Sequence, residues 1–256
     1  MRIGPRPAGS SGSARELRFI VHSLREAGID HPWVQRPHRN VVARIPGSGP
    51  GVVVVGAHHD TKDIPGFVGA NDGASGVAVL LELARELPRR LPGPSIELAF
   101  FDAEEAREDR PFDLDGARGS DQFIRYARAG GIQGTPPLRL IRAMVLFDMV
   151  ADCHLRIPRE ESSDPGLYGL FSRAAGSLSP SGSSAPFLGV APAVLDDHSP
   201  FLGAGVRALD VIDFDYGPGP SPGAWWHTRN DDLRHVCAKS LGAVGDPALE
   251  ALQRIR

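Results

Sequence analysis

One stretch of the sequence, GVVVVGA at positions 51–57, lacks any polar side chain. A β-branched run of this kind is typical of a strand that is covered on both faces, as in a parallel sheet with helices on each side. Two further runs, SIELAFFDA at 95–103 and LRLIRAMVLFDMV at 138–150, also read as strands. These runs restrict the chain to folds in which a central sheet is buried between layers.

Helical patterns alternate with these strands. Apolar residues recur at helical spacing, with Ser13 as a candidate N-cap and Pro88 as a stop. Helices are expected over 13–27, 74–87, 121–129 and from about 246, strands also over 40–46 and 206–214, and a surface loop over 177–186. The alternation predicts an α/β fold of three layers, α/β/α, with a central mixed, mostly parallel sheet. Ligand sites of such folds lie beyond the carboxyl ends of the strands.

The composition and net charge limit the domain organisation and the classes of binding partner. A chain of 256 residues, 41% of them hydrophobic, is large enough for its own core, and we expect one catalytic domain over 1–256 that acts as a monomer. A net charge of −3 does not favour a nucleic-acid or anionic-membrane partner. No apolar run is long enough for a membrane span, and no signal peptide opens the chain, so we expect a cytoplasmic protein or a trimmed secreted or periplasmic form. Whether Cys153 and Cys237 pair is open.

Side chains with metal-binding chemistry follow the predicted strands. The segments are GAHHD (56–60), GANDGASG (69–76), DAEE (102–105), FDM (147–149) and WWHTRND (225–231). Each supplies an imidazole or a carboxylate. This nitrogen and oxygen set suits a catalytic zinc, although it also tolerates other divalent ions.

Each of these residues also has an ordinary structural explanation. His58 alone reads as a polar strand end, but Asp60, two positions on, is placed to orient its free ring nitrogen. Asp72 is equally compatible with a turn or a helix cap. Adjacent Glu104 and Glu105 need a cation or a shared proton if they are buried, and so does Asp148 within an apolar strand.

Taken together, these motifs resemble the zinc-dependent aminopeptidases of the α/β exopeptidase type, which include the glutaminyl cyclases. The resemblance runs from GPRPAGS (4–10) to the last helix. It implies a zinc exopeptidase-like fold and assigns a catalytic acid or base to Glu104. The metal-ligand positions that it implies are His58, Asp72, Glu105, Asp148 and His227.

Within that family the sequence looks more like a glutaminyl cyclase. The segments DDHSPF (196–201) and WWHT (225–228) carry this likeness. The resemblance implies that Asp196 shares protons with Glu104 and Asp148, and that Trp226 packs beside the last zinc ligand in the substrate pocket. It further implies one Zn²⁺, held by Asp72, Glu105 and His227.

The sequence departs from the cyclases at one place. A tryptophan commonly follows the Glu pair in that branch, whereas AREDRPF (106–112) has no aromatic residue before Phe112. This leaves the pocket wall at that point open.

The expected function is therefore a zinc-dependent glutaminyl-peptide cyclotransferase, an acyltransferase that converts N-terminal glutamine of peptides or proteins to pyroglutamate and releases ammonia. The first alternative is a two-zinc aminopeptidase, with His58 and Asp148 holding the second metal and Asp72 bridging. The second alternative is a binding module without catalysis on the same fold.

Overall fold

The computed structural model describes residues 3–107 and 110–255. Its helices and strands, in chain order, are α1 (Ser11–Glu26), β1 (Trp33–Val34), β2 (Val41–Ile45), β3 (Val52–His58), α2 (Ala74–Glu86), β4 (Ser95–Phe101), α3 (Phe112–Asp115), α4 (Arg118–Arg128), a 3-10 turn (Leu138–Leu140), β5 (Ile141–Asp148), β6 (Arg159–Glu160), α5 (Pro165–Leu178), β7 (Val190–Ala191), α6 (Ser199–Gly203), β8 (Ala208–Ile212) and α7 (Ala238–Leu252). No helix in this described part of the chain is long and apolar enough to cross a bilayer.

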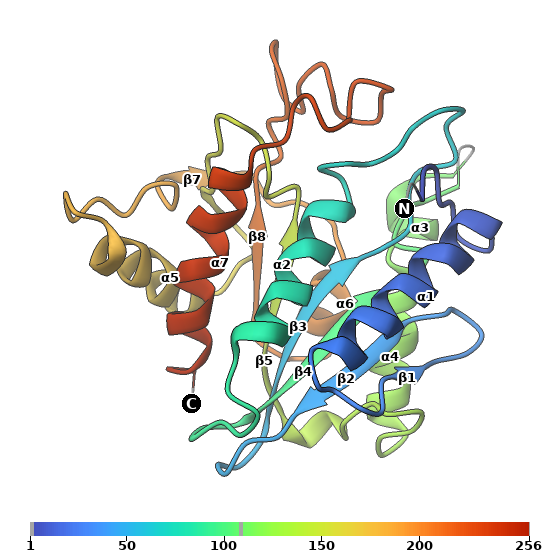
Figure 1. The fold of residues 1–256 in the computed structure, drawn as a ribbon, viewed down its shortest axis with the longest axis vertical. Helices are drawn as coiled ribbons and strands as arrows, with labels where there is room; N and C mark the ends of the chain where they lie inside the picture. The colour runs from blue at the N-terminus through green and yellow to red at the C-terminus, as the bar shows by residue number, and fades with distance from the viewer. Residues whose placement is uncertain (1–2, 108–109, 256) are drawn as a thin grey trace.

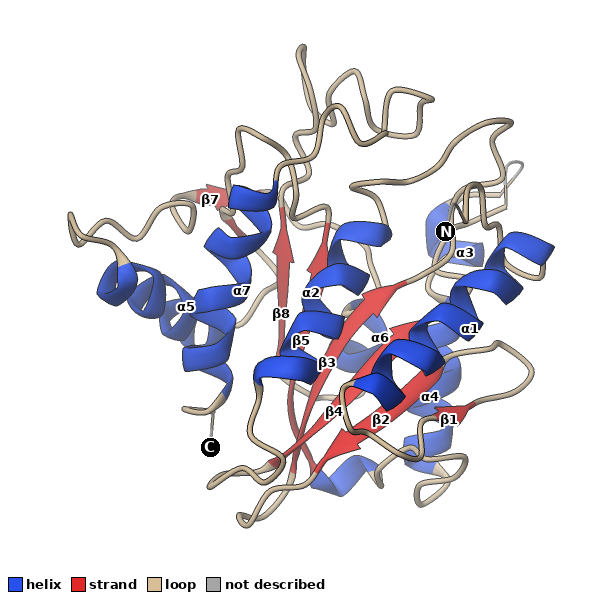
Figure 2. Cartoon of the chain, in the orientation of Figure 1, coloured by secondary structure: helices blue, strands red, loops and turns tan. Residues whose placement is uncertain are grey.

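The main sheet has the order β1-β2-β4-β3-β5-β8. Strands β4, β3, β5 and β8 are parallel, whereas β1 and β2 join antiparallel at one edge. The predicted mixed, mostly parallel sheet is thus confirmed. The carboxyl ends of the parallel strands lie on the same side of the sheet, and the loops that follow these strands gather there (Figure 2).

The sheet lies between two layers of helices (Figure 1). Alternate side chains of β3 divide between them: Val53 and Val55 belong to one apolar cluster with α1, α2, α5 and α7. Val54 faces the other cluster, with Phe123 of α4 and Phe201 of α6. This division explains why residues 51–57 lack a polar face.

Two sequence expectations were wrong in detail, and one helix was missed. The first helix begins at Ser11 and its N-cap is Ser10, whose hydroxyl accepts from the Ser13 backbone N–H, so Ser13 is not the cap. The last helix begins at Ala238 and contains Pro247 within it. Helix α5 was not expected, although Asp164 caps it and Pro165 occupies its first turn.

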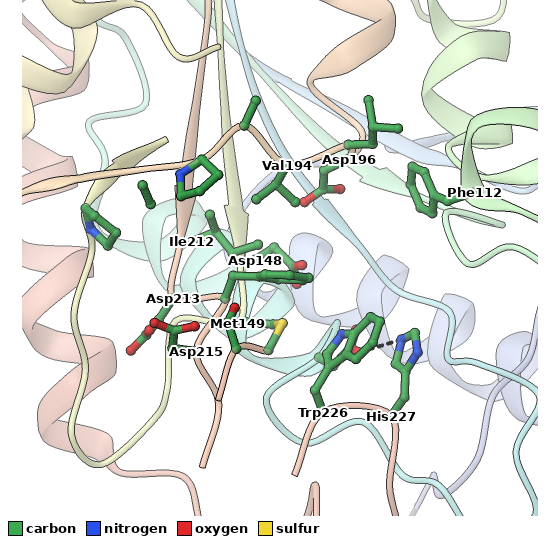
Figure 3. A pocket seen from close by; sticks show the side chains of 18 of the residues that line it. Phe112, Asp148, Met149, Val194, Asp196, Ile212, Asp213, Asp215, Trp226 and His227 are labelled. Atoms are coloured by element: carbon green, nitrogen blue, oxygen red, sulfur yellow. Dashed lines mark ion pairs between the residues drawn. The ribbon is translucent and has the colours of Figure 1, made fainter. Parts of the chain in front are cut away.

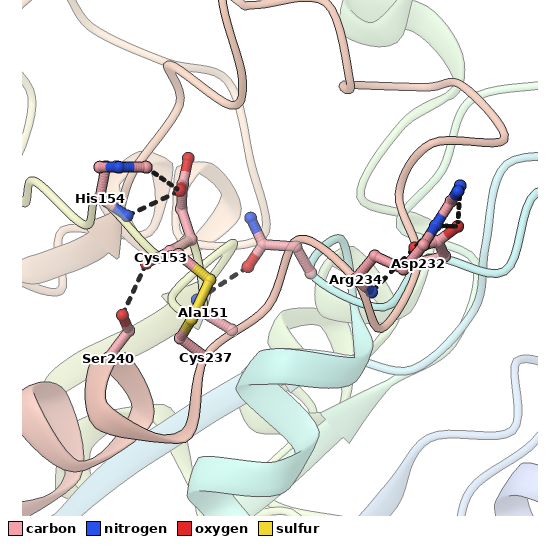
Figure 4. The surroundings of a disulfide bond; sticks show 9 residues. Ala151, Cys153, His154, Asp232, Arg234, Cys237 and Ser240 are labelled. Atoms are coloured by element: carbon pink, nitrogen blue, oxygen red, sulfur yellow. Dashed lines mark hydrogen bonds and ion pairs between the residues drawn. A yellow bond between two sulfur atoms is a disulfide. The ribbon is translucent and has the colours of Figure 1, made fainter.

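Cys153 and Cys237 form a disulfide across 84 residues of sequence (Figure 4). The bond joins the segment after β5 to the start of α7. Hydrogen bonds run alongside it: the Cys237 backbone N–H donates to Ala151 O at 2.8 Å, and Ser240 Oγ donates to Asp152 O at 2.6 Å. The loop between β8 and α7 is therefore anchored at its far end.

Candidate active site

Three predicted ligands converge at the carboxyl edge of the sheet. His227 Nε2 lies 3.3 Å from Asp72 Oδ2 and 3.2 Å from Glu105 Oε1. Asp72 precedes α2, Glu105 follows β4, and His227 lies in the loop before α7. Asp72 Oδ2 and Glu105 Oε1 are buried, and neither has a hydrogen-bond partner among the described residues. Two unpartnered carboxylate oxygens and an imidazole nitrogen facing one point fit a zinc ion.

A second group shares Asp72. His58 Nε2 lies 3.2 Å from Asp72 Oδ1 and 3.2 Å from Asp148 Oδ1. His58 ends β3 and Asp148 ends β5. The two oxygens of Asp72 therefore face two separate candidate cation positions, as in a bridging carboxylate.

Asp60 and Asp231 hold the ligand-bearing backbone. Asp60 accepts from the backbone N–H groups of Glu104 and Glu105 at 3.0 and 3.3 Å. Asp231 accepts from those of Asn71 and Asp72 at 2.7 and 3.0 Å. Asp60 Oδ1 also lies 3.6 Å from His58 Nδ1, within ion-pair distance, so Asp60 faces the ring nitrogen of His58 as well as the backbone of the Glu pair.

Asp60→Asn is expected to weaken zinc binding by about 10-fold to 100-fold, because an amide in place of the carboxylate can no longer accept both N–H groups equally well. Titration of the metal-free protein with zinc would measure the change. Asp63→Asn, an exposed neighbour on the same loop, is the matched control. Equal affinities for the two variants would contradict a positioning role for Asp60.

The backbone at the site adopts unusual conformations. Ala103, Met149 and His227 have φ of 60°, 50° and 51°, in the left-handed region that non-glycine residues rarely occupy. Ala103 directly precedes Glu104, Met149 directly follows Asp148, and His227 is itself a proposed ligand. Such strain is typical of functional sites, where neighbouring structure holds the backbone in place. Close packing contributes as well: a Cβ at Gly76 of α2 would collide with the Phe147 carbonyl oxygen.

Carboxyl groups beside the ligands retain protons readily. Burial, with Glu105 and Asp196 nearby, raises the pKa of Glu104 well above its ordinary value. Burial and the neighbouring Asp210 and Asp148 raise the pKa of Asp196 in the same way. Asp196 therefore lies near Glu104 and Asp148, and proton sharing among the three carboxyl groups stays a prediction.

These groups line a cavity of about 870 Å³ (Figure 3). Trp226 stacks on His227, with ring centroids 3.8 Å apart and planes 16° from parallel. At the wall where the sequence has no tryptophan, Phe112 and Arg110 line the cavity.

Two residues that contribute to the candidate active site were not identified from the sequence. Lys62 lines the cavity, with Nζ 3.7 Å from Glu105 Oε2. Arg6 is buried, and its guanidinium donates to the backbone carbonyl groups of His59, Val68 and Gly69. Arg6 therefore ties the N-terminal segment to the loop that leads to Asp72. The motif GPRPAGS contains this arginine, but its partners lie more than 50 residues away.

Asp213 lies on the cavity wall, and we expect its burial to make the stability of the protein depend on pH. Burial raises its pKa from 3.8 to about 7. Between these values the folded protein keeps a proton that the unfolded chain has released, so this stabilisation is present at low pH and is lost as pH rises to about 7. From pH 5 to pH 8, the unfolding free energy of Asp213→Asn should rise relative to that of the unmodified protein by about 2–3 kcal/mol.

Urea unfolding at both pH values would measure this difference, with exposed Asp30→Asn as the control. A difference that does not change with pH would contradict the prediction.

Fold and site together define an α/β metalloenzyme of the zinc exopeptidase type. The model of peptidase family M28 matches residues 40–252. A glutaminyl cyclase structure from an Acidobacteriales bacterium is 33% identical, with a TM-score of 0.84, over 99% of this chain and 89% of that one. The Porphyromonas gingivalis glutaminyl cyclase is 27% identical, with a TM-score of 0.81, over 98% and 92%. The Bos taurus glutaminyl-peptide cyclotransferase is 29% identical over 89% of this chain and 72% of its own length.

The chain belongs to peptidase family M28, in its glutaminyl cyclase branch.

Proposed function

We propose that this protein is a glutaminyl-peptide cyclotransferase, which closes the N-terminal glutamine of a peptide or protein into pyroglutamate. The observation that carries the proposal is the convergence of Asp72, Glu105 and His227 beside buried Glu104, with Trp226 stacked on His227. Relatives named as glutaminyl cyclases over nearly the whole chain support it.

Asp72, Glu105 and His227 would hold one zinc ion. Zinc bound there supplies a Lewis acid for the side-chain carbonyl of the glutamine. The apolar wall beside it, including Trp226, positions that side chain and excludes water.

Glu104 moves the proton. The substrate's α-amine nitrogen forms a bond to the side-chain carbonyl carbon, and the bond from that carbon to the amide nitrogen breaks. Glu104 accepts a proton from the amine and delivers it to the departing nitrogen, which leaves as ammonia. Its raised pKa suits it to both steps, since it binds and releases a proton closer to neutral pH than an exposed glutamate. Asp196 and Asp148 are proposed to share protons with it.

A two-zinc aminopeptidase is the second candidate, favoured by one observation. His58 and Asp148 form a second candidate ligand group with the other oxygen of Asp72, Oδ1. In that reaction Glu104 would deprotonate the attacking water. A binding module without catalysis is not favoured, because Glu104, Asp148 and Asp196 line the same cavity as the three proposed zinc ligands.

Metal content and product analysis test the proposal together. One zinc per chain with ammonia release from Gln-peptides supports the cyclotransferase. Two metals with amino-acid release from aminoacyl amides would replace it by the aminopeptidase. The residues assigned to the cyclisation line one cavity of this chain. We therefore propose that residues 1–256 act as one catalytic domain, and that the protein acts as a monomer.

A further inference from the structure

The cavity is larger than the proposed reaction requires. Cavities of about 300–1,000 Å³ hold drug-sized ligands, and this one measures about 870 Å³. The reacting groups of the substrate both belong to its first residue. The buried groups for the chemistry, among them Glu104 and His227, form only part of the lining. The remaining wall is free to contact the residues that follow.

Eight consecutive residues of that wall are non-polar. Leu188, Gly189, Val190, Ala191, Pro192, Ala193, Val194 and Leu195 all line the cavity, and we call this segment the apolar rim. Three of its large side chains are well exposed: Leu188 by 60%, Val190 by 62% and Leu195 by 58%. Large apolar side chains grouped in an exposed patch mark binding surfaces.

The apolar rim is continuous with the reaction site. Residue 195 is followed directly by Asp196, which lies among the buried carboxyl groups. Figure 3 shows Val194 and Asp196 on one segment that crosses the cavity beside Ile212 and Asp148. A substrate held by its first residue at the carboxylates therefore has its second residue within reach of this segment.

Charged groups of the cavity wall lie outside the rim. Arg156 pairs with Asp215 at 3.3 Å, and Lys62 with Glu105 at 3.7 Å. Arg110 is the cation on the wall that contains Phe112. The rim itself therefore offers apolar contact without a charge.

We propose that the apolar rim binds the second residue of the substrate and selects peptides in which a large apolar residue follows the N-terminal glutamine. This specificity rests on the proposed cyclotransferase function. Burial of one leucine side chain against the rim is expected to raise kcat/KM by about 10-fold to 100-fold over a small or charged residue.

The test compares ammonia release from Gln-Leu-Gly, Gln-Gly-Gly and Gln-Asp-Gly amides. The leucine peptide should react fastest. Leu188→Ser combined with Leu195→Ser should reduce this advantage to a few-fold, measured within the variant as the ratio of kcat/KM for the Gln-Leu-Gly peptide to kcat/KM for the Gln-Gly-Gly peptide. Leu178→Ser, at an exposed leucine of α5 outside the cavity lining, is the control and should retain the full preference.

Equal rates for the three peptides would overturn the proposal. So would a preference for the aspartate peptide, which would assign the selection to Arg110 instead. If no peptide releases ammonia, the cyclotransferase function itself fails. In that case calorimetric binding of the same peptides to Glu104→Gln still tests the rim: tighter binding of the leucine peptide supports it, and equal binding overturns it.

Discussion

Glu104→Gln is expected to lower kcat for glutamine cyclisation by roughly 10²-fold to 10⁴-fold, the range for loss of a general acid or base. The substitution keeps the size and shape of the side chain but removes the group that accepts and returns the proton. Because Glu104 has no part in holding the rest of the peptide, the loss should fall on kcat rather than on KM. Steady-state ammonia release would measure it.

Two controls separate chemistry from structure. Glu161→Gln makes the same change at an exposed glutamate and should leave turnover unaltered. Glu104→Gln should still bind zinc, because Asp72, Glu105 and His227 are unchanged. Near-normal turnover of this variant would remove Glu104 from the mechanism.

Of the changes in stability predicted here, loss of the disulfide should be the largest. The bond between Cys153 and Cys237 closes 84 residues of chain, and a loop of this length restricts the unfolded state by about 4–5 kcal/mol. That is a large share of the about 5–15 kcal/mol that stabilises a typical domain. Replacement of both cysteines by serine should therefore lower the free energy of unfolding by this amount, measured by urea unfolding.

Reduction provides the matched comparison. Dithiothreitol should lower the stability of the unmodified protein to that of the double serine variant, and it should not change the variant further. Unmodified protein that unfolds identically with and without the reductant would show that the disulfide does not contribute.

The centre of the fold was predictable because local pattern and tertiary environment agree there. Residues 51–57 are apolar throughout and form β3, which is buried on both faces. Helix α2 was predicted from its apolar stripe and the proline that ends it. The convergence of the proposed metal ligands was predictable as well, because parallel strands end on the same side of the sheet.

Other features depend on contacts that no local pattern reveals. Glycines at positions 166, 169 and 176 obscure the helical pattern of α5, which packs on α7 and β8. The last helix was expected from about residue 246, whereas α7 begins at Ala238 and contains the buried Pro247. The roles of Arg6 and Asp231 follow from partners that are 53 to 160 residues distant in sequence.

Because Asp72 contributes one oxygen to each candidate cation position, ion binding at one position should affect ion binding at the other. An ion held by one of its oxygens withdraws negative charge from the other, and two nearby cations repel one another. Occupancy of the first position should therefore disfavour occupancy of the second, a negative cooperativity built into one side chain. If both ligand groups bind an ion, the number of ions held would depend on the free metal concentration, with Asp72 as a ligand in either case.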